Sequence, residues 1–343
     1  MKNKVLVTGG CGYIGSHTLI DLIDNGYDVI CADSLINADS SALKGVEKIT
    51  GKNVKNYAVD LCDADAVHKI FAENRDIIGV IHFAALKSVG ESVEKPLAYY
   101  RNNLQSLVNV LGCMSEFDVR HFIFSSSCSV YGNSRVLPVT ENTPFEPAES
   151  PYARTKQIGE DIICDFSLAH PFITNIALRY FNPAGAHESG IIGESSRNLA
   201  SNLVPVITET AIGKRKEVVV FGDDYPTRDG SCIRDYIHVC DIAHAHTLAL
   251  EYAMRRENAT NFEVFNLGTG EGVSVLEAIK AFETENKLQF RYRIGQRRPG
   301  DVISIYANND KAKNALGWIP KYNINDIMRT AWAWEKNRSQ VLV

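Results

Sequence analysis

Features that would place a protein in a membrane or outside the cell are missing from this chain. No segment of its 343 residues approaches the roughly 18 consecutive apolar residues that a membrane-spanning helix needs. The first residues pass directly into a strand-like segment, without the apolar core and small-residue cleavage site of a signal peptide. We therefore expect a cytoplasmic protein with no membrane partner.

Paired cysteines and basic runs are missing as well. The eight cysteines include no C-x-x-C pair and mostly lie inside apolar segments, as expected of reduced core thiols in a cytoplasmic protein. Cys232 and Cys240 have His238 nearby, but the spacing fits no usual zinc site, so we expect no metal. No run of Lys and Arg is present and the net charge is -5, which argues against a nucleic-acid partner.

The composition that is present, 45% hydrophobic and 22% charged, is that of an ordinary globular protein. The length suits one large domain that carries a smaller one. Apolar strand-like runs alternate with helical patterns through the first half of the chain, which predicts an α/β fold with a doubly wound parallel sheet. The runs cover residues 4–8, 27–33, 54–59, 79–85 and 121–124.

A glycine-rich turn follows the first of these runs. Gly10, Gly12 and Gly15 satisfy G-x-G-x-x-G between a strand and a helix, the order needed to bring a pyrophosphate against the backbone at a helix N-terminus. Glycine turns also occur for packing alone. The next strand, however, ends in Asp33, about twenty residues on, where ribose hydroxyls would lie. No Arg or Lys directly follows Asp33, so we expect NAD as the cofactor rather than NADP.

Ligands on such sheets bind beyond the carboxyl ends of the strands. Three segments that end at this edge carry small or polar residues: the glycine turn, residues 83–85 and residues 125–127. Asp60 is expected to end its strand at the same edge, where an adenine amino group is its plausible partner. Serines in such places are also common simply because loops are hydrated.

One further stretch, residues 150–156, carries a candidate catalytic pair. Ser150 can cap a helix, Pro151 suits its first position, and Tyr152 and Lys156 then lie one turn apart on the same face. A nearby positive charge favours the ionised phenol, so Lys156 is expected to lower the pKa of Tyr152 and make it a proton acceptor near neutral pH. Taken alone, such a pair is also common on ordinary helix surfaces.

The glycine turn, Ser127 and the Tyr152-x-x-x-Lys156 pair together resemble the extended short-chain dehydrogenase/reductase family. Longer segments are similar to its UDP-galactose 4-epimerase members, and the similarity runs to residues 315–318 (ALGW) and the last helix. The segments are residues 82–92 (HFAALKSVGES), 179–187 (RYFNPAGAH), 221–230 (FGDDYPTRDG) and 233–239 (IRDYIHV).

The resemblance implies a molecule of two parts. An NAD-binding Rossmann domain would span residues 1–180 and take back a segment at about 238–269 that contains a strand. A smaller α/β domain for a UDP-sugar would be assembled from residues 181–237 and 270–343. A homodimer is implied through the helices near 91–116 and 151–169, although the apolar residues of these helices could equally face only the sheet.

The resemblance also implies the residues of the site. The catalytic set is Tyr152, Lys156 and Ser127. The cofactor set is Gly9, Gly12, Tyr13, Ile14, Gly15, Asp33, Asn37, Asp60, Leu61, Phe83, Ala84, Ala85, Lys87, Asn102, Ser125, Tyr152, Lys156 and Phe181. The set for the UDP-sugar is Ser127, Asn182, Asn202, Leu203, Val219, Phe221, Arg234, Tyr236, Arg298, Asp301 and Ile305. For either arginine alone, a surface ion pair is the competing interpretation.

The implied reaction is reversible inversion at C4 of UDP-glucose and UDP-galactose. Tyr152 would take the C4 hydroxyl proton with help from Ser127 while the hydride passes to the nicotinamide, and the 4-keto sugar would turn over before the hydride returns. Lys156 would also hold the nicotinamide ribose. Sugar-nucleotide 4,6-dehydratases usually carry Thr-Asp-Glu where this chain has Ser127-Cys128-Ser129, so elimination is disfavoured.

Few residues depart from the family pattern. Ala85 and Ser129 stand where glycine and threonine are frequent. Ile305 occupies a position that is tyrosine in members restricted to glucose and galactose, and small in members that accept N-acetylated sugars. An epimerase of UDP-N-acetylglucosamine, or one that serves both substrates, is therefore the alternative. A non-catalytic NAD-binding module and a net dehydrogenase are more distant alternatives.

Overall fold

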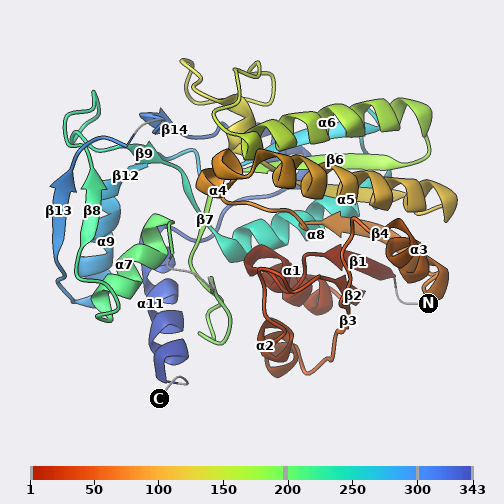
Figure 1. Cartoon of the computed structure of the whole chain (residues 1–343), viewed down its shortest axis with the longest axis horizontal. Coiled ribbons are helices and arrows are strands. Elements are labelled where there is room, and N and C mark those ends of the chain that lie inside the picture. The colour runs from red at the N-terminus through yellow and green to blue at the C-terminus, as the bar shows by residue number, and fades with distance from the viewer. Residues whose placement is uncertain (1–2, 196–199, 299–300, 341–343) are drawn as a thin grey trace.

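The computed structural model describes residues 3–195, 200–298 and 301–340. It consists of a large sheet with helices on both faces and a smaller assembly of short strands and helices beside it (Figure 1). Within the described ranges, no helix combines the length and the apolar character that crossing a membrane would require.

The large sheet contains seven strands, and every pair of neighbours is parallel. In spatial order they are β11 (Phe262–Leu267), β6 (Thr174–Tyr180), β5 (His121–Ser127), β4 (Ile77–His82), β1 (Lys4–Thr8), β2 (Asp28–Ala32) and β3 (Lys55–Tyr57). The order reverses on either side of β1, so the chain winds outward in both directions. This confirms the predicted doubly wound fold.

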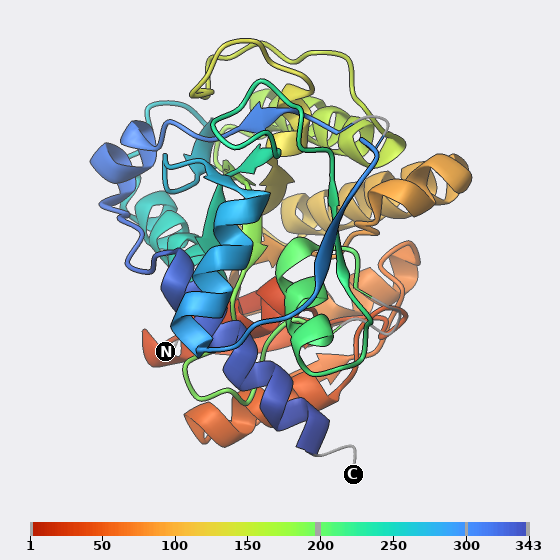
Figure 2. The same cartoon turned by 90° about the vertical axis from the view of Figure 1, so that its left-hand side faces the viewer.

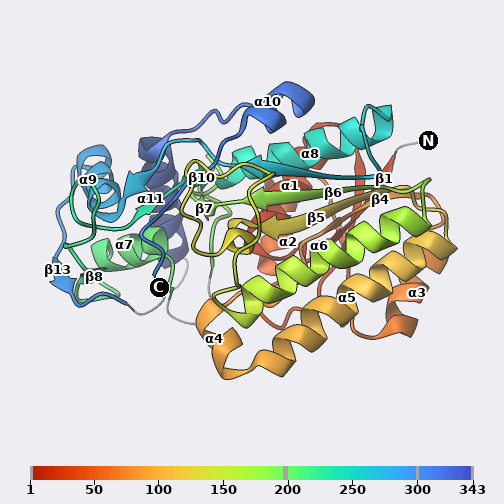
Figure 3. The ribbon, with the colours of Figure 1, turned by 90° about the horizontal axis from the view of Figure 1, so that it is seen from above.

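Alternation along the strands divides the core into two layers. Val5 and Val7 face one cluster of buried residues, and Leu6 between them faces the other. Figure 3 shows α5 and α6 lying side by side on one face of the sheet. The first face is covered by α1 (Tyr13–Asp24), α2 (Ser41–Thr50), α8 (Val239–Arg255) and α10 (Asp310–Leu316). The second is covered by α3 (Ala64–Glu73), α5 (Pro96–Glu116) and α6 (Pro151–Ala169), with α4 (Val89–Glu94) leading into α5.

Figure 2 shows the helices and strands of the smaller assembly facing the viewer. This assembly has a core of its own, in which Ile207, Phe282 and Met328 are buried. Its strands pair as β7 with β10, β8 with β13, and β9 between β12 and β14. They are β7 (Asn182–Ala184), β8 (Val218–Phe221), β9 (Ile233–Arg234), β10 (Tyr236–His238), β12 (Val273–Ser274), β13 (Tyr292–Gly295) and β14 (Ser304–Ile305). Its helices are α7 (Leu203–Ala211), α9 (Val275–Asn286) and α11 (Ile324–Gln340).

Local signals set the helix that carries the catalytic pair. The Ser150 side chain accepts a hydrogen bond from the Ala153 amide and Pro151 is the first helical residue, as predicted.

The third strand is shorter than predicted, because β3 ends at Tyr57 and the Val59 amide then donates to the Tyr57 carbonyl. Asp60 therefore lies in the following loop rather than at the strand end.

All eight cysteines are free thiols. Four are buried, three are partly buried and Cys164 is exposed, so the expectation of core thiols holds for only part of the set. Among the described residues, no group of three or more His, Cys, Asp or Glu side chains is arranged to hold a metal ion.

Candidate active site

The glycine turn between β1 and α1 is packed closely against itself and against the end of β4. A Cβ on Gly15 would lie 2.3 Å from the Gly9 carbonyl oxygen, and one on Gly9 would lie 2.8 Å from the Ala84 amide nitrogen. Gly9 also has φ +69°, which favours glycine. A Cβ on Gly12 would meet, among described residues, only the Gly9 oxygen at 3.1 Å. The outer side of the turn at Gly12 is thus open to a pyrophosphate.

Asp33 is held in place at the end of β2. One carboxylate oxygen accepts from the Cys11 amide at 3.1 Å, and the other accepts from the Leu35 amide at 2.9 Å. Burial raises the pKa of Asp33, while these two N–H donors act in the opposite direction. A carboxylate has about four acceptor positions, so capacity remains for ribose hydroxyls. The turn and Asp33 together fit a dinucleotide.

Other cofactor candidates surround this edge. Phe83, Ala84 and Ala85 follow β4, whose last residue, His82, pairs with Thr8 of β1 and with Phe124 of β5. The Tyr13 hydroxyl donates to the Gly185 carbonyl at 2.6 Å, which joins α1 to the smaller assembly. Two of the remaining cofactor candidates lie on helices, Ile14 on α1 and Asn102 on α5. Two are exposed in loops, Asn37 after β2 and Lys87 after β4. Two are buried, Leu61 next to Asp60 and Phe181 after β6.

The three catalytic candidates lie on adjoining elements. Ser127 is the last residue of β5, and Tyr152 and Lys156 lie on α6, which packs beside that strand. The Lys156 ammonium donates to the Ser125 carbonyl at 2.6 Å and lies 6.0 Å from the centre of the Tyr152 ring. The structure thus brings together the residues that the sequence singled out separately.

The predicted effect of Lys156 on Tyr152 is wrong for these residues by themselves. Burial raises the pKa of Tyr152 to about 12, and only the hydrogen bond with Ser127 lowers it. Burial likewise lowers the pKa of Lys156 to about 8, partly offset by the nearby charge of Glu160. Burial shifts the pKa values of Tyr152 and Lys156 in opposite directions because loss of solvent penalises both the phenolate and the ammonium. The Lys156 ammonium is also directed to a backbone carbonyl rather than to the Tyr152 hydroxyl. In the protein by itself, burial therefore dominates the pKa of Tyr152.

A buried ion pair supports the catalytic helix from behind. The Arg179 guanidinium of β6 binds the Glu160 carboxylate, with Nε 2.9 Å from Oε1, and both side chains are about 5% exposed or less. The Ser126 hydroxyl donates to the same carboxylate. The network joins α6 to β5 next to Ser127. Sequence reasoning missed it, because the participants are separated by 19 and 34 residues.

Asn103 is a second supporting residue that the sequence did not reveal. Its side chain accepts from the Leu86 amide at 2.8 Å and donates to the Thr155 hydroxyl at 3.1 Å. It therefore ties the loop after β4, which carries Ala85 and Lys87, to the catalytic helix. The side chain of Asn102 donates to Asn103 at 3.0 Å.

The candidate uridine diphosphate residues form a second group on the smaller assembly. Arg298 and Arg234 both approach one oxygen of Asp301, at 2.7 and 3.8 Å. The Arg298 guanidinium also lies 5.4 Å from the centre of the exposed Phe221 ring, and Val219 lies two residues earlier on β8, on the same side. The structure thus joins these five residues around one cluster of two cations, one carboxylate and one aromatic ring.

The remaining substrate candidates flank this cluster. Tyr236 of β10 pairs with Asn182 of β7, and Ile305 of β14 pairs with Arg234 of β9. Asn202 and Leu203 lie at the N-terminus of α7. Asp235, which the sequence did not single out, is fully buried and accepts from the amides of Thr269 and Ala307 at 2.8 and 3.1 Å. Its carboxylate fixes the connection between β9, which carries Arg234, and β10, which carries Tyr236.

Comparison with protein families gives a match over residues 6–331 to the model described as GDP-mannose 4,6 dehydratase. Among individual relatives, the chain is 44% identical to the UDP-glucose 4-epimerase of Haemophilus influenzae, over 97% of each chain. Sequence and family model thus agree on the extended family, and the relatives point to its epimerases.

Solved structures agree with this. The chain is 42% identical to a UDP-glucose 4-epimerase from Stenotrophomonas maltophila with bound NAD and formylated UDP-arabinopyranose, with a TM-score of 0.95 over 99% of this chain and 100% of that one. It is 46% identical to the enzyme from Bifidobacterium longum in complex with NAD+ and UDP, with a TM-score of 0.93 over 98% of this chain and 99% of that one.

Proposed function

The chain belongs to the UDP-glucose 4-epimerase family, and we propose that it catalyses the reversible inversion of C4 in UDP-glucose and UDP-galactose with NAD as cofactor. The observation that carries this proposal is the meeting of Ser127, Tyr152 and Lys156 at the end of β5, at the same edge of the sheet as the dinucleotide turn. A cluster of cations on the smaller assembly provides binding groups for a diphosphate.

Each of the catalytic residues has a separate role in the proposed reaction. Tyr152 accepts the proton of the C4 hydroxyl and later returns it, Ser127 hydrogen-bonds the same oxygen, and Lys156 holds the nicotinamide ribose. Oxidised NAD, when bound, supplies a hydride acceptor that carries the positive charge needed for an ionised Tyr152. Arg234 and Arg298 bind the diphosphate, so the 4-keto sugar stays tethered while it turns over.

Product analysis tests this function. Purified protein incubated with UDP-galactose should form UDP-glucose, and the reverse reaction should reach the same mixture. Denaturation should release NAD that copurified, because the cofactor is regenerated in every cycle. The proposal fails if neither UDP-sugar is converted, and NADH accumulating in solution would indicate a net dehydrogenase instead.

The same site could accept N-acetylated UDP-sugars, and Ile305 is the residue that favours this second candidate. Its side chain is 6% exposed and lies in an apolar cluster with Phe181 and Ala307, against which Cys128 packs. Cys128 directly follows Ser127 in the chain, and Ile305 pairs with Arg234 in the sheet. A residue of intermediate size here leaves more room beside the sugar than tyrosine would.

Ile305→Tyr should lower kcat/KM for UDP-N-acetylgalactosamine relative to UDP-galactose by about tenfold, because the larger ring fills space that an acetamido group needs. Steady-state rates on both substrates measure the ratio. Ile303→Tyr is the matched control, since Ile303 is two residues away and 41% exposed. An unchanged ratio in Ile305→Tyr would refute the gating role.

We propose a homodimer through α5 and α6. The apolar residues of α5 divide between two sides: Leu107 and Leu111 are buried against the sheet, whereas Leu97 is 80% exposed and Val108 is 47% exposed. Leu168 on the neighbouring α6 is 78% exposed. Exposed apolar side chains on two adjacent helices support a second copy of the chain as the partner.

Leu97→Glu combined with Leu168→Glu should convert the dimer to a monomer, since two like charges per chain would be buried at the interface. Light scattering coupled to gel filtration gives the mass. Ile319→Glu is the control, because Ile319 is 58% exposed and follows α10, which packs on α8 at the opposite face of the sheet. A mass that stays dimeric in the double variant would exclude this interface.

The two-part division and the location are proposals too. We propose that residues 1–180 with about 238–269 bind NAD, and that residues 181–237 with 270–343 bind the UDP-sugar, which the separate buried cores support. A cytoplasmic location is supported by the eight free thiols.

A further inference from the structure

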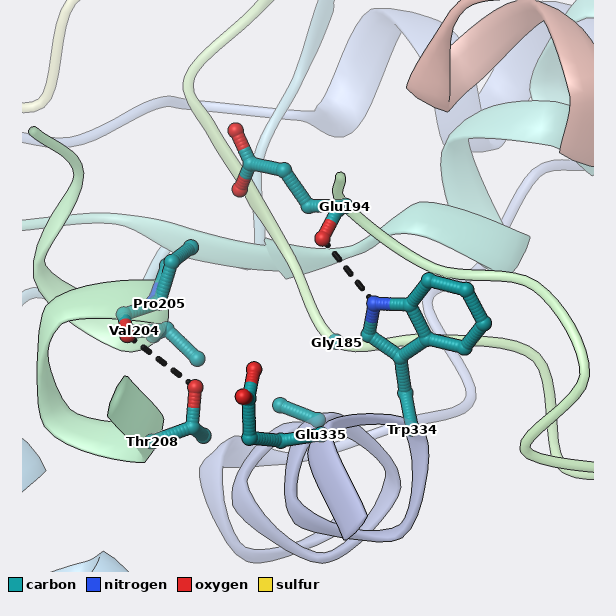
Figure 4. Close-up of a pocket in the computed structure, with 8 residues that line it drawn as sticks. Gly185, Glu194, Val204, Pro205, Thr208, Trp334 and Glu335 are labelled. Atoms are coloured by element: carbon teal, nitrogen blue, oxygen red, sulfur yellow. Dashed lines mark hydrogen bonds between the residues drawn. The ribbon is translucent and has the colours of Figure 1, made fainter. Parts of the chain in front are cut away.

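Glu194, which none of the motifs singled out, lies between the candidate cofactor residues and the candidate UDP-sugar residues. It follows Gly193, which forms an antiparallel bridge with Ala186 in the segment after β7. The Glu194 carbonyl accepts from the Trp334 indole of α11 at 2.9 Å. Figure 4 shows the Glu194 carboxylate extending away from this indole. Glu194 also lines a small cavity of about 10 Å³, together with Thr208 and Glu335. The backbone is therefore anchored on one side and the carboxylate is presented on the other.

The Glu194 carboxylate contacts one candidate cofactor residue, Lys87, and one candidate substrate residue, Asn202. The same oxygen, Oε1, lies 2.9 Å from the Asn202 amide nitrogen and 3.6 Å from the Lys87 ammonium. The Glu194 side chain is 9% exposed, whereas that of Lys87 is 67% exposed. A mostly buried carboxylate thus binds both an exposed lysine and the side chain of the residue that precedes α7.

These partners are far apart in sequence and belong to different ligands. Lys87 is a cofactor candidate in the loop after β4, and Asn202 is a substrate candidate at the N-terminus of α7. The charge of Glu194 also reaches Tyr13, a third ligand candidate, whose pKa is raised well above its usual value by burial first and by this carboxylate second. An exposed ion pair would stabilise the fold little, so the arrangement calls for another role.

We propose that Glu194 is a positioning residue whose single carboxylate orients Lys87 for contact with the cofactor and Asn202 for contact with the UDP-sugar. The inference rests on the proposed function, which assigns these two partners to the two ligands. The carboxylate acts through two separable interactions: it accepts a hydrogen bond from Asn202, and its negative charge attracts the Lys87 ammonium. Glutamine would keep the first and lose the second, and alanine would lose both.

Glu194→Gln and Glu194→Ala test the two interactions separately. In Glu194→Ala, the Kd for UDP by calorimetry and the KM for UDP-galactose should both rise about tenfold, the loss expected for a hydrogen bond to a charged group. In Glu194→Gln, the Kd for UDP should stay within about twofold of the wild type. In both variants, the fraction of protein that retains NAD after gel filtration should fall severalfold. Glu188→Gln is the matched control, because Glu188 lies on the same segment but pairs with Arg329 at the surface.

The outcomes distinguish the role from a purely structural one. A general loss of folding would lower thermal stability and affect both ligands equally in both variants, which would overturn the proposal. Unchanged UDP affinity in Glu194→Ala, or unchanged NAD retention in Glu194→Gln, would also overturn it. If Glu194→Ala does not fold, Glu194→Gln alone decides through NAD retention at preserved UDP affinity. If the wild-type protein binds both ligands but converts no UDP-sugar, the proposed function fails while these binding tests keep their meaning.

Discussion

Replacing Tyr152 with phenylalanine should lower kcat by about 10³-fold or more, within the range lost when a general acid–base group is removed. The substitution keeps the ring that is packed in the buried site and removes only the hydroxyl that would exchange a proton with C4. Tyr152 lies on α6, whereas the cations proposed to bind the diphosphate, Arg234 and Arg298, lie on the smaller assembly, so the change leaves those contacts in place. The Kd for UDP should therefore stay within about twofold.

Initial rates with UDP-galactose, together with calorimetric titration of UDP, measure both quantities. Tyr252→Phe is the matched control: it removes a buried hydroxyl of α8 that donates to Glu263 at 3.1 Å, away from the catalytic helix. Its kcat should remain close to that of the wild type. A Tyr152→Phe enzyme that turns over at more than a tenth of the wild-type rate would remove Tyr152 from the mechanism.

The second large effect is expected from Gly15→Ala. The new Cβ would lie 2.3 Å from the Gly9 carbonyl oxygen and 2.8 Å from the Gly10 Cα, and both are backbone atoms that cannot turn aside. The turn is held by hydrogen bonds from the Gly12 amide to Gly9 and from the Gly9 amide to Ala32, so relieving the contact must deform it. We expect copurified NAD to fall at least tenfold, since the turn is the proposed pyrophosphate site.

Released NAD per mole of protein, measured after denaturation, checks this result. Gly112→Ala is the control, because Gly112 lies inside α5 and a Cβ there meets no described atom within 4 Å. That variant should retain NAD, because the substitution leaves the glycine turn unchanged. Wild-type NAD content in Gly15→Ala would show that the turn tolerates a side chain and would argue against its proposed role.

Most of the fold was predictable because its signals are local. The extent of β1, the start of α1 at the glycine turn and the cap at Ser150 all depend on residues within a few positions of one another. The smaller assembly was predictable only through family resemblance. Its β9, β12 and β14 are two residues long, too short for any periodic pattern, and they exist because distant segments pair.

The sequence predicted which residues meet at the catalytic centre, but not the shifts of their pKa values or the buried carboxylates that support them. Tyr152 and Lys156 could be placed on one helical face from their spacing. The direction in which the pKa of Tyr152 shifts, however, depends on burial, which the sequence does not reveal. Glu160 and Glu194 escaped notice for a related reason. Each looks like an ordinary surface carboxylate in the sequence, and only tertiary packing makes Glu160 a buried partner of Arg179 and Glu194 a link between two loops.

The return of the chain to the large sheet limits how this enzyme can be rebuilt. Strand β11 forms one edge of that sheet and α8 covers part of a face, although both come after the first part of the smaller assembly, β7 to β10, in the sequence. A cut after residue 180 would strip the sheet of an edge strand and uncover the apolar layer under α8. The part that we propose to bind NAD therefore cannot be exchanged between enzymes as one contiguous segment, and a chimera must carry both of its stretches together.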